Sequence, residues 1–161
     1  RIARIQNDFW RESFGAALEN EALDTVELEE MATRWANVIS RPNDARLRTL
    51  VALEVATVRG FALVHASHDP DSDQVVDGEL GEFVIEAKHR NVGHGSRLLQ
   101  ACADTLRADG FRRAVWWINS TNEITRAFAE AAGWAPDGAH RELEGDAGQR
   151  LKQVRLHTAL M

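Results

Sequence analysis

One segment, residues 79–96, constrains the fold of this chain more than any other. It reads ELGEFVIEAKHRNVGHGS, a strand-like apolar run that passes through two glycines directly into a helical pattern. Glycines at such a junction let the backbone approach a ligand closely, and the N–H groups of the first helical turn point outwards together. The helix dipole and these free donors favour a bound phosphate or diphosphate, to which Arg90 would add a charge-assisted contact. A glycine-rich helix start that only allows tight packing is the alternative.

Periodicity and turn residues predict the elements around this junction. Capping-box patterns at 24–27 and 120–123 mark two helix starts. The predicted helices are 2–17, 24–38, 96–109 and 120–133. The predicted strands are Leu47–Glu54, Arg59–Ala66, Leu80–Ile85, Arg113–Ile118, Ala139–Glu144 and Leu151–Ala159. The polar, acidic stretch 67–78 is predicted to be a loop. This order, ααβββαβαββ, indicates an α+β fold with a β-α-β unit in its middle.

Length and composition limit the class of protein. The chain has 161 residues, of which 44% are hydrophobic and 27% charged, and this favours one globular domain over residues 1–161. No apolar window approaches the ~20 residues of a membrane-spanning helix, and the first 25 residues lack a signal-peptide pattern. A net charge of −6 argues against nucleic-acid binding and suits a cationic substrate such as an amine.

Single residue types add further expectations. Cys102 is the sole cysteine, which excludes an intramolecular disulfide and favours a reducing, cytoplasmic compartment. The histidines and the acidic stretch 69–73 match no zinc or calcium spacing, so no metal is expected. Arg outnumbers Lys by 17 to 2, which favours a GC-rich bacterial source. The chain contains no Tyr, so any mechanism that needs a phenol is excluded.

Four motifs together resemble the GNAT superfamily of acyl-CoA-dependent N-acetyltransferases. The loop RNVGHG at 90–95 resembles the acyl-CoA loop Q/R-x-x-G-x-G/A of that family, and ELGEFVI at 79–85 resembles its splayed strand. WINSTN at 117–122 matches the next strand and its terminal Asn, and Phe128 with Gly133-Trp134 matches a later motif. The resemblance covers nearly the whole chain. It implies a mixed central sheet with splayed middle strands flanked by four helices, with the first strand of the family missing from the chain as given.

The resemblance also implies a site for acetyl-CoA as co-substrate. The diphosphate would lie on backbone N–H groups of the loop, and the pantetheine arm would lie between the splayed strands. The N–H of Phe83 would polarise the thioester carbonyl. Asn122 would hold the pantetheine from the other side, with helix capping as its alternative role. The implied cofactor-binding residues are Phe83, Val84, Ile85, Arg90, Asn91, Val92, Gly93, His94, Gly95, Ser96 and Asn122.

A general base must take the proton of the acceptor amine, because an alkyl ammonium with a pKa near 10 is not a nucleophile. Glu79 stands where several family members place a base and is the first candidate. Glu82 is the alternative, three residues on and therefore on the opposite face of a regular strand. The alternative for both residues is a solvated strand carboxylate that has no catalytic role. Ala129 departs from the family pattern, which has Tyr there as the acid for the leaving thiolate.

The expected function is direct transfer of acetyl to a primary amine of a small molecule. Two alternatives remain at this point: an acyl-CoA-binding or regulatory module with weak or lost catalysis, and a protein-lysine or N-terminal acetyltransferase. Trp10 and Trp35 are expected in the core or in an acceptor pocket covered by the acidic connection 15–25. Exposed strand edges would allow a homodimer.

Overall fold

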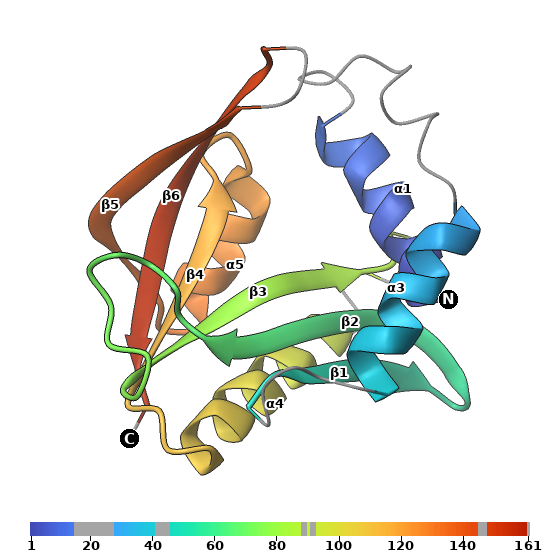
Figure 1. The fold of residues 1–161 in the computed structure, drawn as a ribbon, viewed down its shortest axis with the longest axis horizontal. Helices are drawn as coiled ribbons and strands as arrows, with labels where there is room; N and C mark the ends of the chain where they lie inside the picture. The colour runs from blue at the N-terminus through green and yellow to red at the C-terminus, as the bar shows by residue number, and fades with distance from the viewer. Residues whose placement is uncertain (15–27, 41–45, 88–89, 91–92, 145–147, 161) are drawn as a thin grey trace.

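A computed structural model of the chain describes residues 1–14, 28–40, 46–87, 90, 93–144 and 148–160 (Figure 1). Within these residues it contains a six-stranded mixed sheet and four helices. The helices are α1 (Ile2–Phe14), α3 (Leu28–Ser40), α4 (His94–Ala108) and α5 (Glu123–Ala131). The strands are β1 (Arg48–Glu54), β2 (Thr57–Ala66), β3 (Asp77–Ile85), β4 (Arg113–Asn119), β5 (Ala135–Glu144) and β6 (Arg150–Ala159). The predicted α+β class and element order are confirmed.

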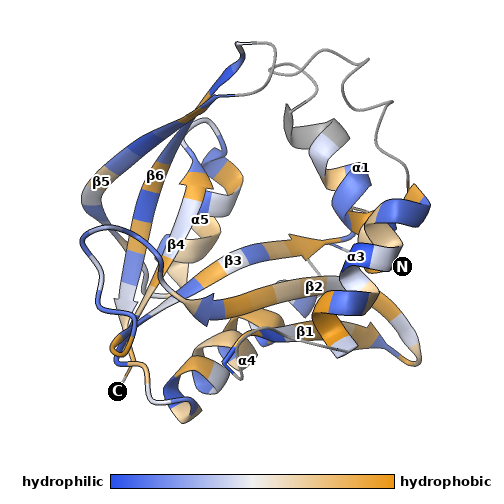
Figure 2. Ribbon diagram, in the orientation of Figure 1, coloured by the Kyte–Doolittle hydropathy of each residue, from blue (hydrophilic) through white to orange (hydrophobic). Residues whose placement is uncertain are grey.

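The sheet has the order β1-β2-β3-β4-β6-β5. β3 and β4 are parallel and are joined through α4, while every other neighbouring pair is antiparallel. α4 packs on β1, β2 and β3, and α1 and α3 lie together with α1 against β2 and β3. β2 is largely hydrophobic because helices cover both of its faces, whereas β5 at the sheet edge is largely hydrophilic (Figure 2).

Two hydrophobic clusters follow from this layering. The larger lies on the α4 side and includes Val64, Leu80 and Leu106. The smaller lies on the α1 side, where Ile5 packs with Phe61 of β2 and Val84 of β3. Side chains of successive strand residues point to opposite faces, so β2 and β3 supply both clusters. The described residues contain no helix long and apolar enough to cross a membrane.

The two central strands separate part-way along the sheet. β3 pairs with β4 only from Asp77–Arg113 to Leu80–Trp116, although β3 continues to Ile85 and β4 to Asn119 (Figure 1). Beyond that point the facing backbone groups of the two strands have no ladder partners in each other. A gap whose edges carry backbone groups that do not pair across it therefore opens in the middle of the sheet.

A β-bulge at Gly81 changes which face Glu82 occupies. In the β2–β3 register Leu80 pairs with Val64 and Glu82 pairs with Leu63, so Gly81 is an extra residue. The bulge shifts the alternation by one, and Glu79 and Glu82 consequently lie on the same face. The expectation of opposite faces, which assumed a regular strand, is therefore wrong. A Cβ at Gly81 would lie 2.6 Å from His65 Nε2, so the His65 ring would have to move to admit a side chain there.

Several predicted boundaries also change. β3 begins at Asp77 because Gly78 still pairs with Ala66, so the predicted loop 67–78 is shorter than expected. α5 is capped by Asn122, whose Oδ1 accepts from the N–H of Thr125 at 3.1 Å, and not by Ser120 as the capping-box pattern predicted. The capping box at 24–27, the predicted helical residues 15–17 and the connection 15–25 lie outside the described residues.

Candidate active site

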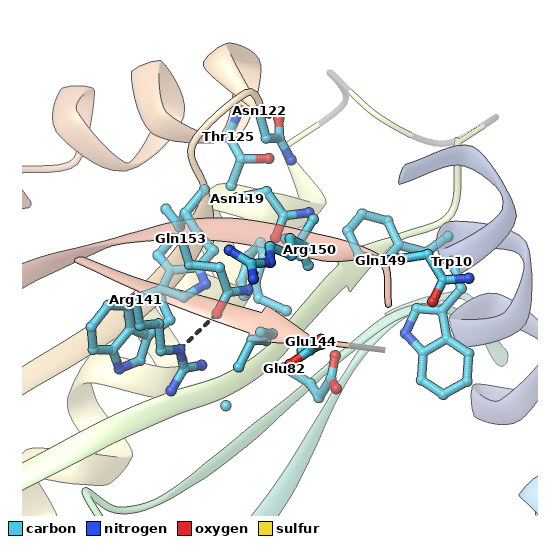
Figure 3. A pocket seen from close by; sticks show the side chains of 18 residues that line it. Trp10, Glu82, Asn119, Asn122, Thr125, Arg141, Glu144, Gln149, Arg150 and Gln153 are labelled. Carbon is cyan, nitrogen blue, oxygen red and sulfur yellow. Dashed lines mark hydrogen bonds between the residues drawn. The ribbon is translucent and has the colours of Figure 1, made fainter. Parts of the chain in front are cut away.

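A cavity of about 500 Å³ lies where β3 and β4 separate (Figure 3). Residues from α1, β3, β4, α5, β5 and β6 line it, so segments from both ends of the chain meet there. Its aromatic wall consists of Phe9, Trp10, Phe83, Trp116 and Trp117. Its polar side chains are Glu82, Asn119, Asn122, Thr125, Arg141, Glu144, Gln149, Arg150 and Gln153.

The backbone of β3 presents donors to this gap. The N–H of Glu86 donates to the carbonyl of Arg59 in β2 at 2.7 Å. Because backbone groups of successive strand residues alternate between the two edges, those of Phe83 and Ile85 point away from β2 and towards the gap. Arg90 Nε donates to the Ile85 carbonyl at 3.2 Å, so that carbonyl already has a partner. Val84 points its backbone to β2 and buries its side chain, and it does not line the cavity.

The N-terminus of α4 provides the donors that the sequence predicted. Gly93 precedes the helix with φ of 90°, and no side chain caps it. The first helical bond in this turn joins Arg97 N to the Gly93 carbonyl at 3.2 Å, so the N–H groups of His94, Gly95 and Ser96 have no acceptor within the helix. The predicted loop residues Asn91 and Val92 lie outside the part of the chain that the structure describes.

Two loop residues also have packing roles. A Cβ at Gly95 would lie 3.3 Å from Phe128 Cζ, so glycine lets α4 approach α5 closely. The His94 ring is 4% exposed, with Nε2 3.2 Å from Glu54 Oε2 and Nδ1 2.6 Å from Arg97 Nη2. The His94 side chain is therefore occupied, and its backbone N–H alone is available to an anion.

Two carboxylates line the cavity, Glu82 of β3 and Glu144 of β5, and Glu82 lies on one of the strands that separate there. Burial raises the pKa of Glu82 to about 7, although a hydrogen bond from Gln6 opposes this. Gln6 Nε2 lies 3.4 Å from Glu82 Oε1, and Gln6 Oε1 accepts from Trp35 Nε1 at 2.8 Å. Trp35 on α3 thus orients the amide that contacts Glu82. A carboxyl group with a pKa near neutrality can take and release a proton at physiological pH.

Glu79 has different surroundings. Its carboxylate lies 3.4 Å from His65 Nε2, and it does not line the cavity. Burial raises the pKa of Glu79, while the nearby His65 lowers it. The His65 ring in turn stacks on His68 with the ring centroids 5.6 Å apart. The structure therefore brings Glu82, and not Glu79, to the gap between the strands.

The comparisons with known proteins bear directly on this geometry. A family model for acetyltransferases of the GNAT family matches residues 4–134. The chain belongs to this family. Mycothiol acetyltransferase of Kineococcus radiotolerans is 31% identical to the chain over 94 residues, which are 58% of this chain and 29% of that protein. The chain thus matches less than a third of the length of that relative.

Solved structures agree on the fold. A ribosomal-protein-alanine N-acetyltransferase from Brucella melitensis aligns with a TM-score of 0.74 at 22% identity, covering 98% of this chain and 91% of that chain. YncA from Salmonella typhimurium, solved with its cofactor acetyl-CoA, aligns with a TM-score of 0.70 at 20% identity, covering 99% and 86%. These likenesses confirm the GNAT-type sheet. The GNAT reaction class is acetyl transfer from acetyl-CoA, so acetyl-CoA is the co-substrate of this family.

The GNAT site of this chain departs from the family pattern on α5. Ala129, where the pattern has Tyr, is fully buried and does not line the cavity. Thr125, one turn earlier on α5, and Asn122 do line it. Asn122 caps the helix with its Oδ1, so the capping role holds, and its place in the cavity wall leaves the amide nitrogen for a ligand.

Several lining residues were not predicted. Arg141 and Leu143 of β5 and Gln153 of β6 reach the cavity because β6 pairs with β4 across the sheet. No motif marks these residues, since their position depends on strand order and not on local sequence. Trp10 lines the cavity, whereas Trp35 acts through Gln6. Among the described residues no group of three His, Cys, Asp or Glu side chains is arranged to hold a metal ion.

Proposed function

We propose that this GNAT chain transfers acetyl from acetyl-CoA directly to a primary amine of a small molecule, with Glu82 as general base. The observation that carries the proposal is Glu82 itself, a carboxylate in the cavity between the separated strands whose pKa is about 7. A base of this pKa is half ionised at neutral pH and can accept the proton of an ammonium group on its way to the reaction.

The coenzyme would occupy the donors already described. Its diphosphate would accept from the N–H groups of the first turn of α4, where the helix dipole favours negative charge. Its pantetheine arm would lie in the gap and pair with the backbone of Phe83 and Ile85. The thioester carbonyl would then lie near the Phe83 N–H, a single oxyanion donor.

The chemical step uses these groups in order. Glu82 takes a proton from the acceptor ammonium, the amine lone pair forms a bond to the acetyl carbon, and the nitrogen then loses its second proton to water. The carbon–sulfur bond then breaks, and its electron pair leaves with the sulfur. A thiol with a pKa near 8.5 is a tolerable leaving group, so water can protonate the thiolate where this chain has Ala129. The products are the N-acetyl amine and CoA.

Direct transfer fits the chemistry of Cys102. That thiol is 1% exposed, packs in the larger hydrophobic cluster, and has its pKa raised to about 12 by burial. A buried thiol of this pKa is a poor nucleophile at neutral pH. An acetyl-cysteine intermediate at this position is therefore disfavoured, and the amine is left as the attacking group.

A thiol-release assay with acetyl-CoA across a panel of amines tests the proposal. We expect release of CoA that depends on the added amine and forms one N-acetyl product per thiol. Ala129 favours a second candidate, an acyl-CoA-binding module of the same fold. Tight binding of acetyl-CoA without amine-dependent release would overturn the enzyme and support that module. Release with peptide N-termini or lysine side chains but with no small amine would instead assign a protein acceptor.

A further inference from the structure

We infer that Arg141 forms a subsite for an anionic group of the acceptor, so that the substrate is an amine that also carries a carboxylate or a phosphate. This inference rests on the proposed function and names the substrate class of the same cavity. Arg141 on β5 and Glu82 on β3 point into that cavity from different strands (Figure 3). One molecule could therefore meet the base at its amine and the guanidinium at its other end.

The guanidinium of Arg141 is held in place without being neutralised. Its Nε donates to Gln153 Oε1 at 2.8 Å, and its Cζ lies 4.3 Å from the centroid of the Trp117 ring. Among the described residues no carboxylate comes within ion-pairing distance of it, so its terminal N–H groups face the cavity without an acidic partner. An arginine fixed by stacking and by one neutral hydrogen bond keeps a planar fork suited to carboxylate or phosphate.

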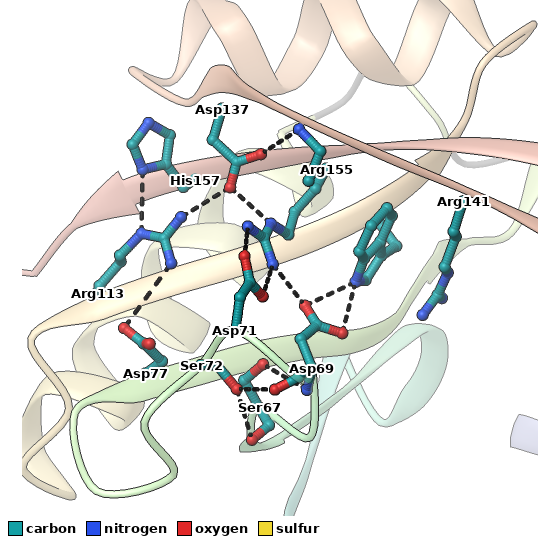
Figure 4. A network of polar contacts seen from close by, with 12 residues as sticks. Ser67, Asp69, Asp71, Ser72, Asp77, Arg113, Asp137, Arg141, Arg155 and His157 are labelled. Carbon is teal, nitrogen blue, oxygen red and sulfur yellow. Dashed lines mark hydrogen bonds and ion pairs between the residues drawn. The ribbon is translucent and has the colours of Figure 1, made fainter.

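Trp117, on which Arg141 stacks, is itself held by a residue of the loop between β2 and β3. Its indole Nε1 donates to the Asp69 carboxylate at 3.0 Å (Figure 4). Asp69 is in turn bound by Arg155, whose Nη1 lies 3.0 Å from Asp69 Oδ2 and whose Nε lies 2.6 Å from Asp137 Oδ2. The Arg155 side chain is 6% exposed, so this support is buried. The Trp117 ring that supports Arg141 is therefore held in place by the protein itself, without a ligand.

The acidic groups near Arg141 have other partners. Glu79 and Asp69 are the carboxylates that act on its charge, and both raise its pKa while burial lowers it. Glu79 pairs with His65, and Asp69 is shared by Trp117 and Arg155. Arg150, a second cation in the cavity wall, lies 3.5 Å from Glu142. Arg141 thus carries a positive charge in the cavity wall that has no ion-pair partner among the described residues. An anionic group of a ligand could pair with it.

A binding experiment in the complex with CoA tests this subsite without requiring turnover. The 15N-labelled protein is saturated with CoA, which has no acetyl group to transfer, and is titrated with matched pairs of amines by NMR. The carboxylate pairs are glycine, β-alanine and 4-aminobutyrate against methylamine, ethylamine and propylamine. The phosphate pair is phosphoethanolamine against ethanolamine. We expect at least one anionic member to bind about tenfold or more tightly than its neutral partner, as a charge-assisted contact provides. The pairs in which this preference appears show whether the subsite binds a carboxylate or a phosphate.

The variant Arg141→Gln should remove that preference and leave the affinities for the neutral amines and for CoA unchanged. Arg141→Lys should restore part of the preference, because it keeps the charge and loses the fork. Arg112→Gln is the matched control, since Arg112 is exposed and lies outside the cavity wall. Equal binding of anionic and neutral partners to the unaltered protein, or an equal loss of both in Arg141→Gln, would overturn the subsite. A failed transfer reaction would show separately in the thiol-release assay.

Discussion

Glu79 and Glu82 carry the same side chain three positions apart on one strand, and their surroundings separate them. The bulge at Gly81 turns Glu82 to the face that Glu79 occupies and places it over the gap, where burial raises its pKa to about 7. Glu79 stays in the paired part of the strand against His65. A glycine-initiated bulge cannot be located from ELGEFVI alone, so the sequence could name both carboxylates and could not choose between them.

The raised pKa of Glu82 has a consequence for stability. In the unfolded chain this carboxyl ionises near pH 4.5, and in the folded protein near pH 7. The folded state therefore binds more protons between these values, and its stability falls as pH rises through this window. Glu82→Gln removes the ionisation and keeps an acceptor for Gln6. We expect Glu82→Gln to raise the unfolding temperature at pH 8 and to change it little at pH 4.5.

Thermal unfolding of both proteins at the two pH values is the measurement. Glu29→Gln on the exposed start of α3 is the control, because it removes one negative charge far from the cavity. An equal shift of the unfolding temperature at both pH values, or a shift matched by Glu29→Gln, would show that Glu82 is not held in a neutral form by burial.

The junction of β3 and α4 is the part of the fold that local sequence predicts best. Strand residues, glycines and a helical period follow one another locally, so the succession of strand and helix here could be predicted without distant contacts, although the bulge at Gly81 could not. The start of α5 was harder, because Ser120 and Asn122 can both cap a helix. Asn122 prevails in the structure, with its Oδ1 on the N–H of Thr125. The face and the neighbours of each element depended on strand order, which the sequence pattern does not encode.

The variant Gly93→Asp tests the role of the α4 N-terminus. Gly93 has φ of 90° and faces open space, so the substitution adds backbone strain and a negative charge where the diphosphate would lie. We expect it to lower the affinity for CoA at least a hundredfold while the protein stays folded. Isothermal titration with CoA measures this.

Gly110→Asp is the matched control for that variant. Gly110 has φ of 95° at the other end of the same helix, so it shares the strain and the added charge but not the predicted anion site. A comparable loss of CoA affinity in both variants would assign the effect to helix stability. Unchanged affinity in Gly93→Asp would contradict the diphosphate site.

One buried arginine joins segments of the molecule that are far apart in sequence. Arg155 on β6 binds Asp69 and Asp71 of the β2–β3 loop and Asp137 of β5 (Figure 4). This contact links β5 and β6 to the loop between β2 and β3, which lies on the other side of the β3–β4 pair in the strand order. No local pattern predicted it, because its partners are brought together only when β6 inserts between β4 and β5.

Removing this arginine should destabilise the protein strongly. Arg155→Met leaves the Asp69 carboxylate, whose side chain is 10% exposed, without its cation, and leaves Asp137, which is 7% exposed, with Arg113 alone. We expect a loss of about 3–5 kcal/mol in the free energy of unfolding, measured with urea at pH 7. Burial raises the pKa of Asp137, but the Ala139 N–H and Arg155 together hold it below its usual value, so the loss should shrink as pH falls and Asp137 is protonated.

Asp71→Asn provides the comparison, since the Asp71 side chain is 63% exposed although Arg155 lowers its pKa to about 2. An exposed ion pair contributes little, so this variant should change stability much less than Arg155→Met. Equal effects of the two variants would show that burial of the network does not determine its contribution.

The pH–rate profile of acetyl transfer tests whether Glu82 is the general base. With a saturating amine acceptor, the rate of CoA release should rise with pH through about 7 as Glu82 loses its proton. Glu82→Gln should lower this rate about a hundredfold or more and remove the rise near pH 7, whereas Glu79→Gln should keep both. A Glu82→Gln variant with the rate and profile of the unaltered protein would contradict the assignment of Glu82 as the base.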